Sequence, residues 1–360
     1  MMRFLNLKVE RKEDSNLLLE VLAVAGALAG AILVSGILIK LAGADPIEGF
    51  KNLILGGFGG KRQILETLLR SAPLMLTGLA TVIAFRGEIW SIGQEGQLFA
   101  GAMLSYWLAS QFSDLPQLPL LIIVILGGFI GGAFLGWISG VMKAYFKVDI
   151  IISTVLLNYI INNVILLLLY DNKYWMDDAS FYPRTAPVPD LAWYPILVEG
   201  HRIHIGVLIG LAAALIVYFI LKKTPLGFDI RALGANATAA KYRGLNIKRI
   251  LIITMIISGG LAGLAGAGEV FGVHHKLQMD ISPGYGYTGI IVGMLAELNP
   301  LVTIITAIFF GGLINGSVKL VTTIGIPTAL IYAIQAIILI FILAARVLTR
   351  YRIRRVLDAG

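Results

Sequence analysis

The 360-residue chain has no cysteine, only four histidines and few charged residues. The absence of cysteine excludes disulfides and thiolate metal sites. Charged residues make up 14% of the chain, against about 25% in an average soluble domain, whereas hydrophobic residues make up 58%. This composition excludes a disordered chain, a nucleic-acid-binding domain and an ordinary soluble enzyme. The sequence has no Gly-Lys-Ser/Thr phosphate loop, so ATP hydrolysis by that route is not expected.

Long apolar runs dominate the chain. A membrane crossing needs about 20 apolar residues, and runs that are continuous rather than alternating favour helices over a barrel. We expect segments at 17–39, 65–84, 97–112, 119–142, 150–170, 206–221, 250–271, 288–298, 300–317 and 328–345. The first could instead be a signal peptide cleaved near Ala44, but it exceeds an h-region of about 7–15 residues. The sequence predicts an all-α polytopic membrane protein with about ten transmembrane segments, of which 288–298 is too short to span regularly.

Basic residues predict the orientation, because they gather in cytoplasmic loops. The 222–250 loop carries seven basic residues against one acid, and the 347–360 tail is also basic. We expect both to be cytoplasmic, together with the polar 1–16 segment. The 171–205 loop has five acids and three bases and is expected outside. The 40–64 loop fits least well, because the count of spans places it outside although it carries four bases and two acids.

Five expected spans precede the external loop and five follow it, which is the arrangement of two inverted halves. Each half contains one glycine-interrupted polar stretch, Phe85–Gln97 and Ser282–Gly289, followed by a small apolar helix. Non-helical backbone at membrane depth is tolerated only where it is buried in protein or lines a wet cavity. We therefore expect broken helices and a substrate pathway between the halves.

Polar side chains within membrane segments are candidates for the pathway. The expected pathway residues are Trp90, Gln94, Glu95, Gln97, Asn158, Asn162, Tyr285 and Tyr287. The alternative for any single Asn or Gln is interhelical hydrogen bonding. Arg70 is expected to extend to an interface rather than line a pore. The spacing of Gly259 and Gly263 predicts tight helix packing.

The stretch Pro225–Gly244 within the cytoplasmic loop contains a short helix with small side chains. Asn236 can cap its start, and Gly244 can end it in the left-handed conformation. This helix could dock into a groove of another protein, or the stretch could be a solvated basic loop that serves topology only. The residues by themselves leave both interpretations open.

Residues 227–244 resemble the coupling loop of permeases of the branched-chain amino acid, ribose and nucleoside type in ATP-binding-cassette importers. Four more stretches resemble this family in the same order: Ile92–Leu98, Asp149–Ile160, Ser258–Ala267 and Gly284–Pro300. The resemblance covers about residues 60–345 and is nearest to the larger nucleoside permease. Asp149 departs from it, since the nucleoside branch usually has a Glu nearby.

The resemblance implies a permease domain over 17–346 in the plasma (inner) membrane, with both termini cytoplasmic. It implies a partner ATPase, a second related permease and an external substrate-binding lipoprotein, with nucleosides as substrates and no cofactor. The residues it assigns to ATPase coupling are Gly227, Arg231, Gly234, Asn236, Ala239, Ala240, Arg243 and Gly244. The alternatives are an ion-coupled secondary transporter without an ATPase, supported by the membrane carboxylates Glu88, Glu95 and Glu269, or the same permease type carrying a simple sugar.

The resemblance also implies how transport is driven. ATP binding would close the ATPase dimer, the 236–244 helix would move with it, and the two halves would rock. A tryptophan at Gly234 or Ala239 is expected to uncouple transport while leaving the fold intact. The four histidines, His201, His204, His274 and His275, are not expected to form a metal site, because adjacent histidines on a helix point about 100° apart.

Overall fold

A computed structural model describes residues 7–11, 17–171, 174–325 and 327–355, and these are mostly helical. Part of the expected cytoplasmic N-terminal segment (1–6 and 12–16) and the last residues of the expected basic tail (356–360) lie outside the described residues. The chain divides into two compact units. One comprises 57–315, and the other joins 1–56 to 316–360.

The unit formed by the two ends of the chain contains helix α1 (Leu17–Leu41) packed against helix α13 (Thr328–Arg350). The packing is close at Gly30, where a Cβ would lie 2.4 Å from the Phe341 ring. Strand β1 (Leu7–Arg11) pairs antiparallel with strand β2 (Tyr351–Arg355), so the two ends of the chain lie side by side.

This unit also corrects one expectation. Helix α2 (Pro46–Phe58), most of which belongs to this unit, lies entirely where the sequence predicts a connecting loop over 40–64. The helix follows α1 after a bend of 110°. Its two consecutive glycines, Gly56 and Gly57, argue against a helix in the sequence, but they permit close packing. A Cβ on Gly56 would lie 2.8 Å from Gly316 Cα within the same unit.

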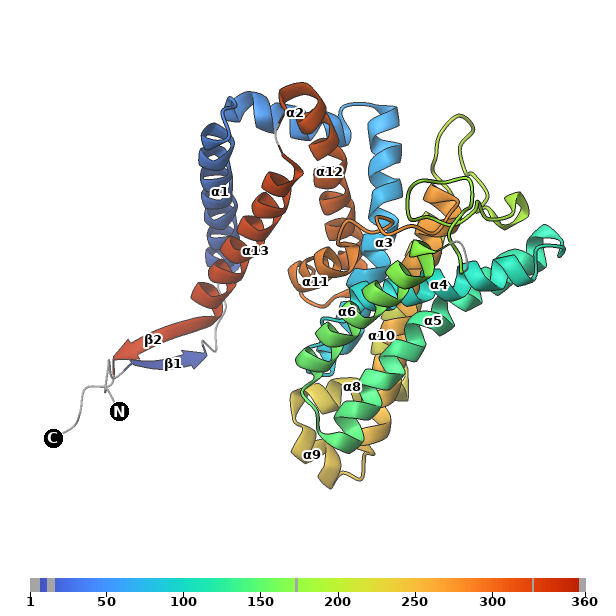
Figure 1. Ribbon diagram of the computed structural model, residues 1–360. Helices are drawn as coiled ribbons and strands as arrows, with labels where there is room; N and C mark the ends of the chain where they lie inside the picture. The colour runs from blue at the N-terminus through green and yellow to red at the C-terminus, as the bar shows by residue number, and fades with distance from the viewer. Residues whose placement is uncertain (1–6, 12–16, 172–173, 326, 356–360) are drawn as a thin grey trace. The chain divides into compact units, whose positions relative to one another are not determined.

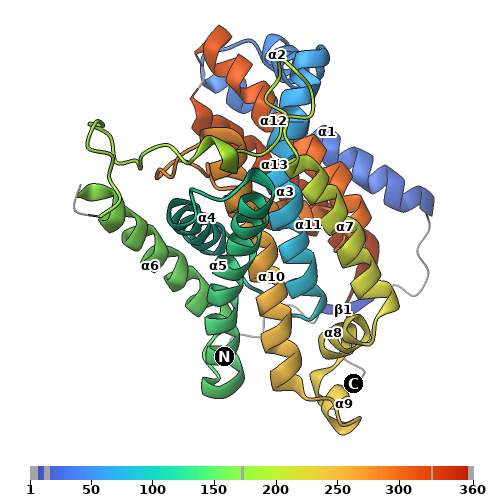
Figure 2. The ribbon, with the colours of Figure 1, turned by 90° about the vertical axis from the view of Figure 1, so that its right-hand side faces the viewer.

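The larger unit holds the remaining helices (Figures 1 and 2). They are α3 (Lys61–Arg86), α4 (Gln94–Gln111), α5 (Gln117–Phe146), α6 (Ile150–Tyr170), α7 (Gly206–Lys223), α8 (Pro225–Ala235), α9 (Ala237–Tyr242), α10 (Ile247–Glu269), α11 (Tyr285–Leu295) and most of α12 (Pro300–Ile324). A single 3₁₀ turn, η1 (Asp190–Ala192), interrupts the 171–205 loop, and a π-helical turn, η2 (Val270–His274), extends α10.

All ten apolar runs that the sequence singles out contain helix. Among the described residues, six helices are long and apolar enough to cross a membrane, or up to seven if the bent pair of α1 and α2 is one span. The six are α3, α5, α6, α7, α12 and α10 with η2. The helices α4 and α11 are not among them, and α11 is only 11 residues long. Ten crossings therefore remain a prediction.

Polar side chains cap the helices next to the basic loop. Asp149 accepts hydrogen bonds from the N–H groups of Ile151 and Ile152 at the start of α6. Thr224 and Asn246 cap α8 and α10 in the same manner. A cap of this kind stabilises a helix by about 1 kcal/mol because it satisfies an otherwise unpaired N–H. Asp149, which departs from the family pattern, thus has a structural role as a helix cap.

Helices α5 and α10 pack along a seam of glycines, as the sequence predicts. A Cβ on Gly132 would lie 2.1 Å from the carbonyl oxygen of Gly259, and a Cβ on Gly263 would lie 2.1 Å from that of Gly128. Only glycine permits this approach of two helix backbones. The seam places α10 at the centre of the larger unit, against α3, α4 and α5.

The 171–205 loop and the α8–α9 segment lie at opposite ends of the larger unit (Figures 1 and 2). The 18-residue helix α7 connects them. The loop folds back on the end of α10, where the N–H groups of Val188 and Tyr194 donate to the carbonyl oxygens of His275 and Phe271, both at 2.9 Å. The sides of the membrane that the loop and the α8–α9 segment face stay predictions.

Candidate functional site

Two short helices of the larger unit meet at their N-termini. Helix α4 follows the non-helical stretch 87–93, and α11 follows the non-helical stretch 275–284. Glu95, in the first turn of α4, accepts a hydrogen bond at 2.7 Å from the N–H of Gly286, in the first turn of α11. Its carboxylate therefore faces the partial positive charge of both helix N-termini. We call this contact the junction.

The junction is tight and built alike on both sides. A Cβ on Gly286 would lie 2.3 Å from the backbone nitrogen of Glu95. Before α4, the Ser91 hydroxyl accepts from the N–H of Gly93 at 3.3 Å. Before α11, the Ser282 hydroxyl accepts from the N–H of Gly284 at 3.2 Å. The same Ser-x-Gly pattern thus precedes both helices, which strengthens the case for two related halves.

Asn158 fastens α6 to the start of α4. Its Oδ1 accepts from the N–H of Gly96 at 2.9 Å, and its Nδ2 donates to the carbonyl oxygen of Ile92 at 2.8 Å. The Nδ2 also lies 3.5 Å from the Tyr287 hydroxyl. Asn158 is 1% exposed. Its amide therefore holds the broken segment in place, as the packing interpretation predicts.

Three other expected amides keep an unused acceptor. The Oε1 atoms of Gln94 and Gln97 and the Oδ1 of Asn162 are buried and find no hydrogen-bond partner among the described residues. Gln94 uses its Nε2 to donate to the Thr81 hydroxyl at 3.3 Å. A buried unpaired acceptor is unfavourable, so these atoms are available to a donor group of a ligand or a water molecule.

The expected aromatic residues differ in exposure. Trp90 and Tyr287 are 43% and 46% exposed, whereas Tyr285 is 4% exposed. The Trp90 ring lies 4.6 Å from that of Phe85, and its Nε1 donates to Glu88 Oε2 at 3.0 Å. Trp90 and Tyr287 thus offer ring faces to a planar molecule, while Tyr285 is buried at the junction.

A polar cavity of about 210 Å³ lies beside the junction. Its lining comes from α3, the end of α10, and the stretch that precedes α11, with Tyr285 among the lining residues. Its ionisable residues are Glu66, Arg70, Arg202, Glu269, His274 and Asp280. We call it the outer cavity, because Arg202 belongs to the loop that is expected outside.

The structure gives Arg70 a specific neighbourhood. The sequence predicts that Arg70 extends to an interface, which stays a prediction; in the structure it lines the outer cavity, and its buried Nε finds no hydrogen-bond partner among the described residues. Sequence reasoning could not place it there, because the acid that lines the same cavity, Glu269, lies about 200 positions further along the chain.

The expected coupling residues belong to two helices rather than one. Helix α8, which the sequence does not single out, packs closely through its glycines. A Cβ on Gly227 would lie 2.0 Å from the carbonyl oxygen of Ile220, and a Cβ on Gly234 would lie 2.2 Å from that of Arg86. The expectation that Gly234→Trp leaves the fold intact is therefore wrong, because no side chain fits there.

Helix α9 forms as predicted. The Asn236 side chain accepts from the N–H of Ala239 at 3.0 Å. Gly244 ends the helix at φ +84°. The N–H of Gly244 donates to the Lys241 carbonyl, and the N–H of Leu245 donates to the Ala240 carbonyl, which is the Schellman pattern.

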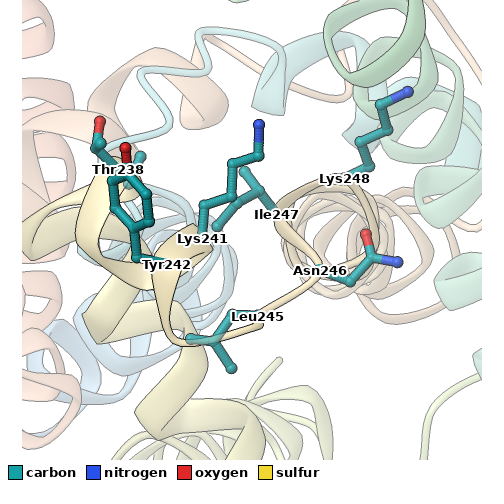
Figure 3. Close-up of a pocket in the computed structure, with 8 residues that line it drawn as sticks. Thr238, Lys241, Tyr242, Leu245, Asn246, Ile247 and Lys248 are labelled. Atoms are coloured by element: carbon teal, nitrogen blue, oxygen red, sulfur yellow. The ribbon is translucent and has the colours of Figure 1, made fainter.

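Most of α9 is exposed. Only Ala240 is buried, while Ala239 is exposed and Tyr242 is 89% exposed. A groove of about 850 Å³ runs between α9 and the start of α10, with Lys241 and Lys248 on its two sides (Figure 3). Helix α9 is therefore exposed at the surface of the larger unit, with a basic groove beside it.

Arg86 connects α8 with the far end of α11. Its Nε donates to the carbonyl oxygen of Leu298 at 2.9 Å, and its Nη2 donates to that of Glu297 at 3.3 Å. These two residues form the turn after α11 and adopt φ values of +56° and +55°, which side chains rarely adopt. Because Gly234 of α8 packs on the Arg86 backbone, one residue contacts both elements.

His204 lies under the 171–205 loop, at the start of α7. It is 2% exposed, and its Nδ1 accepts from the N–H of Gly206 at 3.0 Å. Burial, with the nearby charges of His275 and Arg202, lowers the pKa of His204 to about 4. The pKa of His275 is also lowered, chiefly by burial, and its ring stacks on Trp193 with centroids 3.9 Å apart. Burial thus favours the neutral form of both imidazoles, and both rings pack against aromatic neighbours.

Within the described residues, no group of three or more His, Cys, Asp or Glu side chains could hold a metal ion. His201 and His204 belong to the loop, and His274 lies 3.7 Å from the Glu269 carboxylate. The chemistry that the larger unit offers is therefore hydrogen bonding and charge, distributed over the junction and the outer cavity.

Comparison with known proteins identifies the family. Residues 63–343 match the family described as the permease component of branched-chain amino acid transport systems. The nucleoside ABC transporter permease protein NupB of Lactococcus lactis is 32% identical over 88% of each chain. The guanosine ABC transporter permease protein NupP of Bacillus subtilis is 31% identical over 92% of this chain and 94% of its own. The glucose ABC transporter permease protein TsgB13 of Haloferax volcanii is 28% identical over 92% and 88%.

The match covers most of the chain, and it includes the broken segments, the glycine seam and the α8–α9 segment. The resemblance that the sequence motifs indicate is thereby confirmed, and the apolar helices belong to a multi-pass membrane protein. The chain belongs to the family of branched-chain amino acid transport system permease components and is a permease subunit of an ATP-binding-cassette importer.

Proposed function

We propose that this permease imports nucleosides by alternating access, together with a partner ATPase, a second related permease and an external binding protein. Two of the three relatives described above are named for nucleosides or guanosine, which supports this substrate class. The third is named for glucose, so a simple sugar is the second candidate. We further propose ten crossings, with both termini in the cytoplasm.

The junction is the observation that carries the proposal. It joins the start of α4, in the first expected half, to the start of α11, in the second, through the buried carboxylate of Glu95 and the backbone of Gly286. A nucleoside is neutral and rich in donors and acceptors, and the unpaired oxygens of Gln94 and Gln97 suit its donor groups. In this account the junction is closed in the structure and parts when substrate passes.

The coupling route begins at α9, whose exposed face and basic groove are suited to a cleft in the partner ATPase. Movement of α9 shifts α8, because Asn236 joins the two helices directly. Helix α8 packs through Gly234 against the backbone of Arg86. The Arg86 side chain in turn donates hydrogen bonds to the turn at Glu297 and Leu298. That turn ends α11, whose first turn forms the junction. The proposed route thus connects the ATPase to the junction through packed helices and the side-chain hydrogen bonds of Arg86.

Uptake by a reconstituted importer tests the proposal. The chain, its partner permease, the ATPase and the binding protein are placed in proteoliposomes with labelled adenosine or labelled ribose. ATP-dependent uptake of adenosine that needs all four components is the expected result. ATP-dependent uptake of ribose alone would replace the nucleoside with a sugar. Adenosine uptake by this chain alone, driven by an ion gradient, would contradict the coupling route.

A further inference from the structure

The residues that line the outer cavity have no role in the transport cycle proposed above. Three carboxylates, two guanidinium groups and one imidazole surround about 210 Å³. Charged groups of both signs therefore face one small space. Such groups are unfavourable at partly buried positions unless they find partners.

Two of these side chains carry opposite charges that act on one another: Glu269, which forms a long ion pair with His274, and Arg70, which has an unpaired donor. Glu269 is 4% exposed, and its carboxylate lies 3.7 Å from the His274 imidazole, which is longer than a hydrogen bond. The Nε of Arg70 is buried and finds no partner among the described residues. A carboxylate that can accept thus shares a cavity with a guanidinium that can donate. Their natural complement is a group that both donates and accepts.

Hydroxyl groups have that property, since each supplies one donor and two acceptor lone pairs. Neighbouring hydroxyls on a sugar ring can donate to a carboxylate and accept from an arginine at once, and an acidic residue that binds a ribose hydroxyl recurs in nucleotide-binding proteins. Nucleobases prefer aromatic faces, but among the described residues of the lining Tyr285 is the only Phe, Tyr or Trp. The cavity is also smaller than the roughly 300–1,000 Å³ typical of pockets for drug-sized molecules, so it suits one ring.

We propose that the outer cavity binds the vicinal hydroxyls of the transported solute through Glu269 and Arg70. This inference rests on the proposed function and adds a substrate class, that of polyhydroxylated rings. The source of the hydroxyls is the ribose of a nucleoside or a free sugar. A phosphate group is disfavoured, because the three carboxyl groups of the lining outnumber its two guanidinium groups.

The outer cavity also lies beside the junction. Tyr285 lines it, and the next residue, Gly286, donates the hydrogen bond of the junction. A solute held by Glu269 and Arg70 therefore contacts the first turn of α11. A solute in the outer cavity would therefore lie next to the closed junction.

The absence of cysteine from the chain permits a direct test. Val273→Cys places one thiol in the lining with little change of volume. The assembled permease pair with its ATPase, in lipid nanodiscs without the binding protein, is labelled with a water-soluble maleimide. Adenosine and ribose are expected to slow labelling at least fivefold at saturation. The analogue 2′,3′-dideoxyadenosine, which keeps the base and loses both hydroxyls, and AMP are expected to have no effect.

Two variants in the same background sharpen the test. Glu269→Gln is expected to abolish protection by adenosine, whereas Asp114→Asn, an exposed acid in the turn between α4 and α5, is expected to retain it. Equal protection by adenosine and dideoxyadenosine overturns the inference, and so does protection by AMP. The dideoxy comparison needs no change at Glu269, so it holds even if that variant does not fold. Protection by ribose alone keeps the cavity and favours the sugar.

The two proposals fail separately. If the complete wild-type importer shows no ATP-driven uptake of adenosine, the proposed nucleoside function is refuted, whatever the labelling shows. Normal uptake with no hydroxyl-dependent protection refutes the outer cavity and leaves the proposed function standing.

Discussion

Gly286→Ala tests the junction most simply, because it adds one methyl group where two helix backbones touch. The new Cβ would lie 2.3 Å from Glu95 N and 2.6 Å from Glu95 Cα. Carbon atoms prefer separations of about 3.5–4.0 Å, so the helices must part by about 1 Å. That shift lengthens the 2.7 Å hydrogen bond to Glu95 beyond useful range.

The energy follows from these two effects. Overpacking of this kind costs about 1–3 kcal/mol, and loss of a hydrogen bond to a charged group costs about 1.5–3 kcal/mol. We expect the closed junction to lose about 2.5–6 kcal/mol. Even 2 kcal/mol changes a two-state ratio by about 30-fold. The variant should therefore leave the junction open far more often.

The assay is ATP-driven uptake in proteoliposomes, together with thermal unfolding of the purified assembly. Gly286→Ala should lower the unfolding temperature and reduce uptake per ATP hydrolysed at least tenfold. Gly268→Ala is the matched control, since a Cβ there meets nothing within 4 Å. It should behave as wild type or slightly better, because alanine favours a helix. Wild-type uptake and stability for Gly286→Ala would refute the tight junction.

Three further predictions concern the coupling route and the external loop. Ala239→Trp, on the exposed face of α9, should leave the fold intact but reduce coupled transport at least tenfold. Gly234→Trp should fail to fold, because its side chain meets the Arg86 backbone. Measurement of ATPase co-purification and of thermal unfolding for the two variants checks this difference. Arg86→Gln should lose the clamp on Leu298, so that ATP hydrolysis continues while uptake falls; a parallel fall in both rates would contradict the route. The pKa of His204 is lowered to about 4 from about 6.5 in the unfolded chain, so the neutral form favours folding, and stability should fall by up to about 3 kcal/mol as the pH drops from about 6.5 to 4. Unfolding temperatures of wild type and His204→Gln across that range check the loss, which should be smaller in the variant; the remainder comes from His275, whose pKa is also lowered.

Much of this fold follows from local chemistry and could be predicted. The apolar runs become helices because length and hydropathy are properties of the chain alone. Helix α9 was predictable because Asn236 and Gly244 act on their own backbone neighbours. The two broken segments were also predictable, since glycine and polar residues interrupt an apolar pattern there.

The features that sequence reasoning missed depend on distant contacts. Helices α2 and α8 contain glycines, which in a sequence suggest a helix break. At Gly227 and Gly234, however, glycine is required because another segment of backbone lies where a side chain would be. Arg70 and Glu269 come to line one cavity only after α3 and α10 pack together. The pairing of Glu95 with Gly286 joins residues 191 positions apart, and no local signal marks it. The expected roles of the pathway and coupling residues stay predictions.

The account's central claim is that the pathway passes the junction, and the accessibility of Tyr287 tests it directly. Tyr287→Cys and, as a control on the exposed side of the apolar helix α6, Leu167→Cys place single thiols at residues that are 46% and 61% exposed. Each assembly is treated with a water-soluble and a lipid-soluble thiol reagent, with and without ATP and vanadate. We predict that the thiol of Tyr287→Cys reacts with the water-soluble reagent at a rate that changes at least fivefold on trapping, while the thiol of Leu167→Cys reacts only with the lipid-soluble one. A Tyr287→Cys variant that behaves like the Leu167→Cys control in both states would contradict the claim.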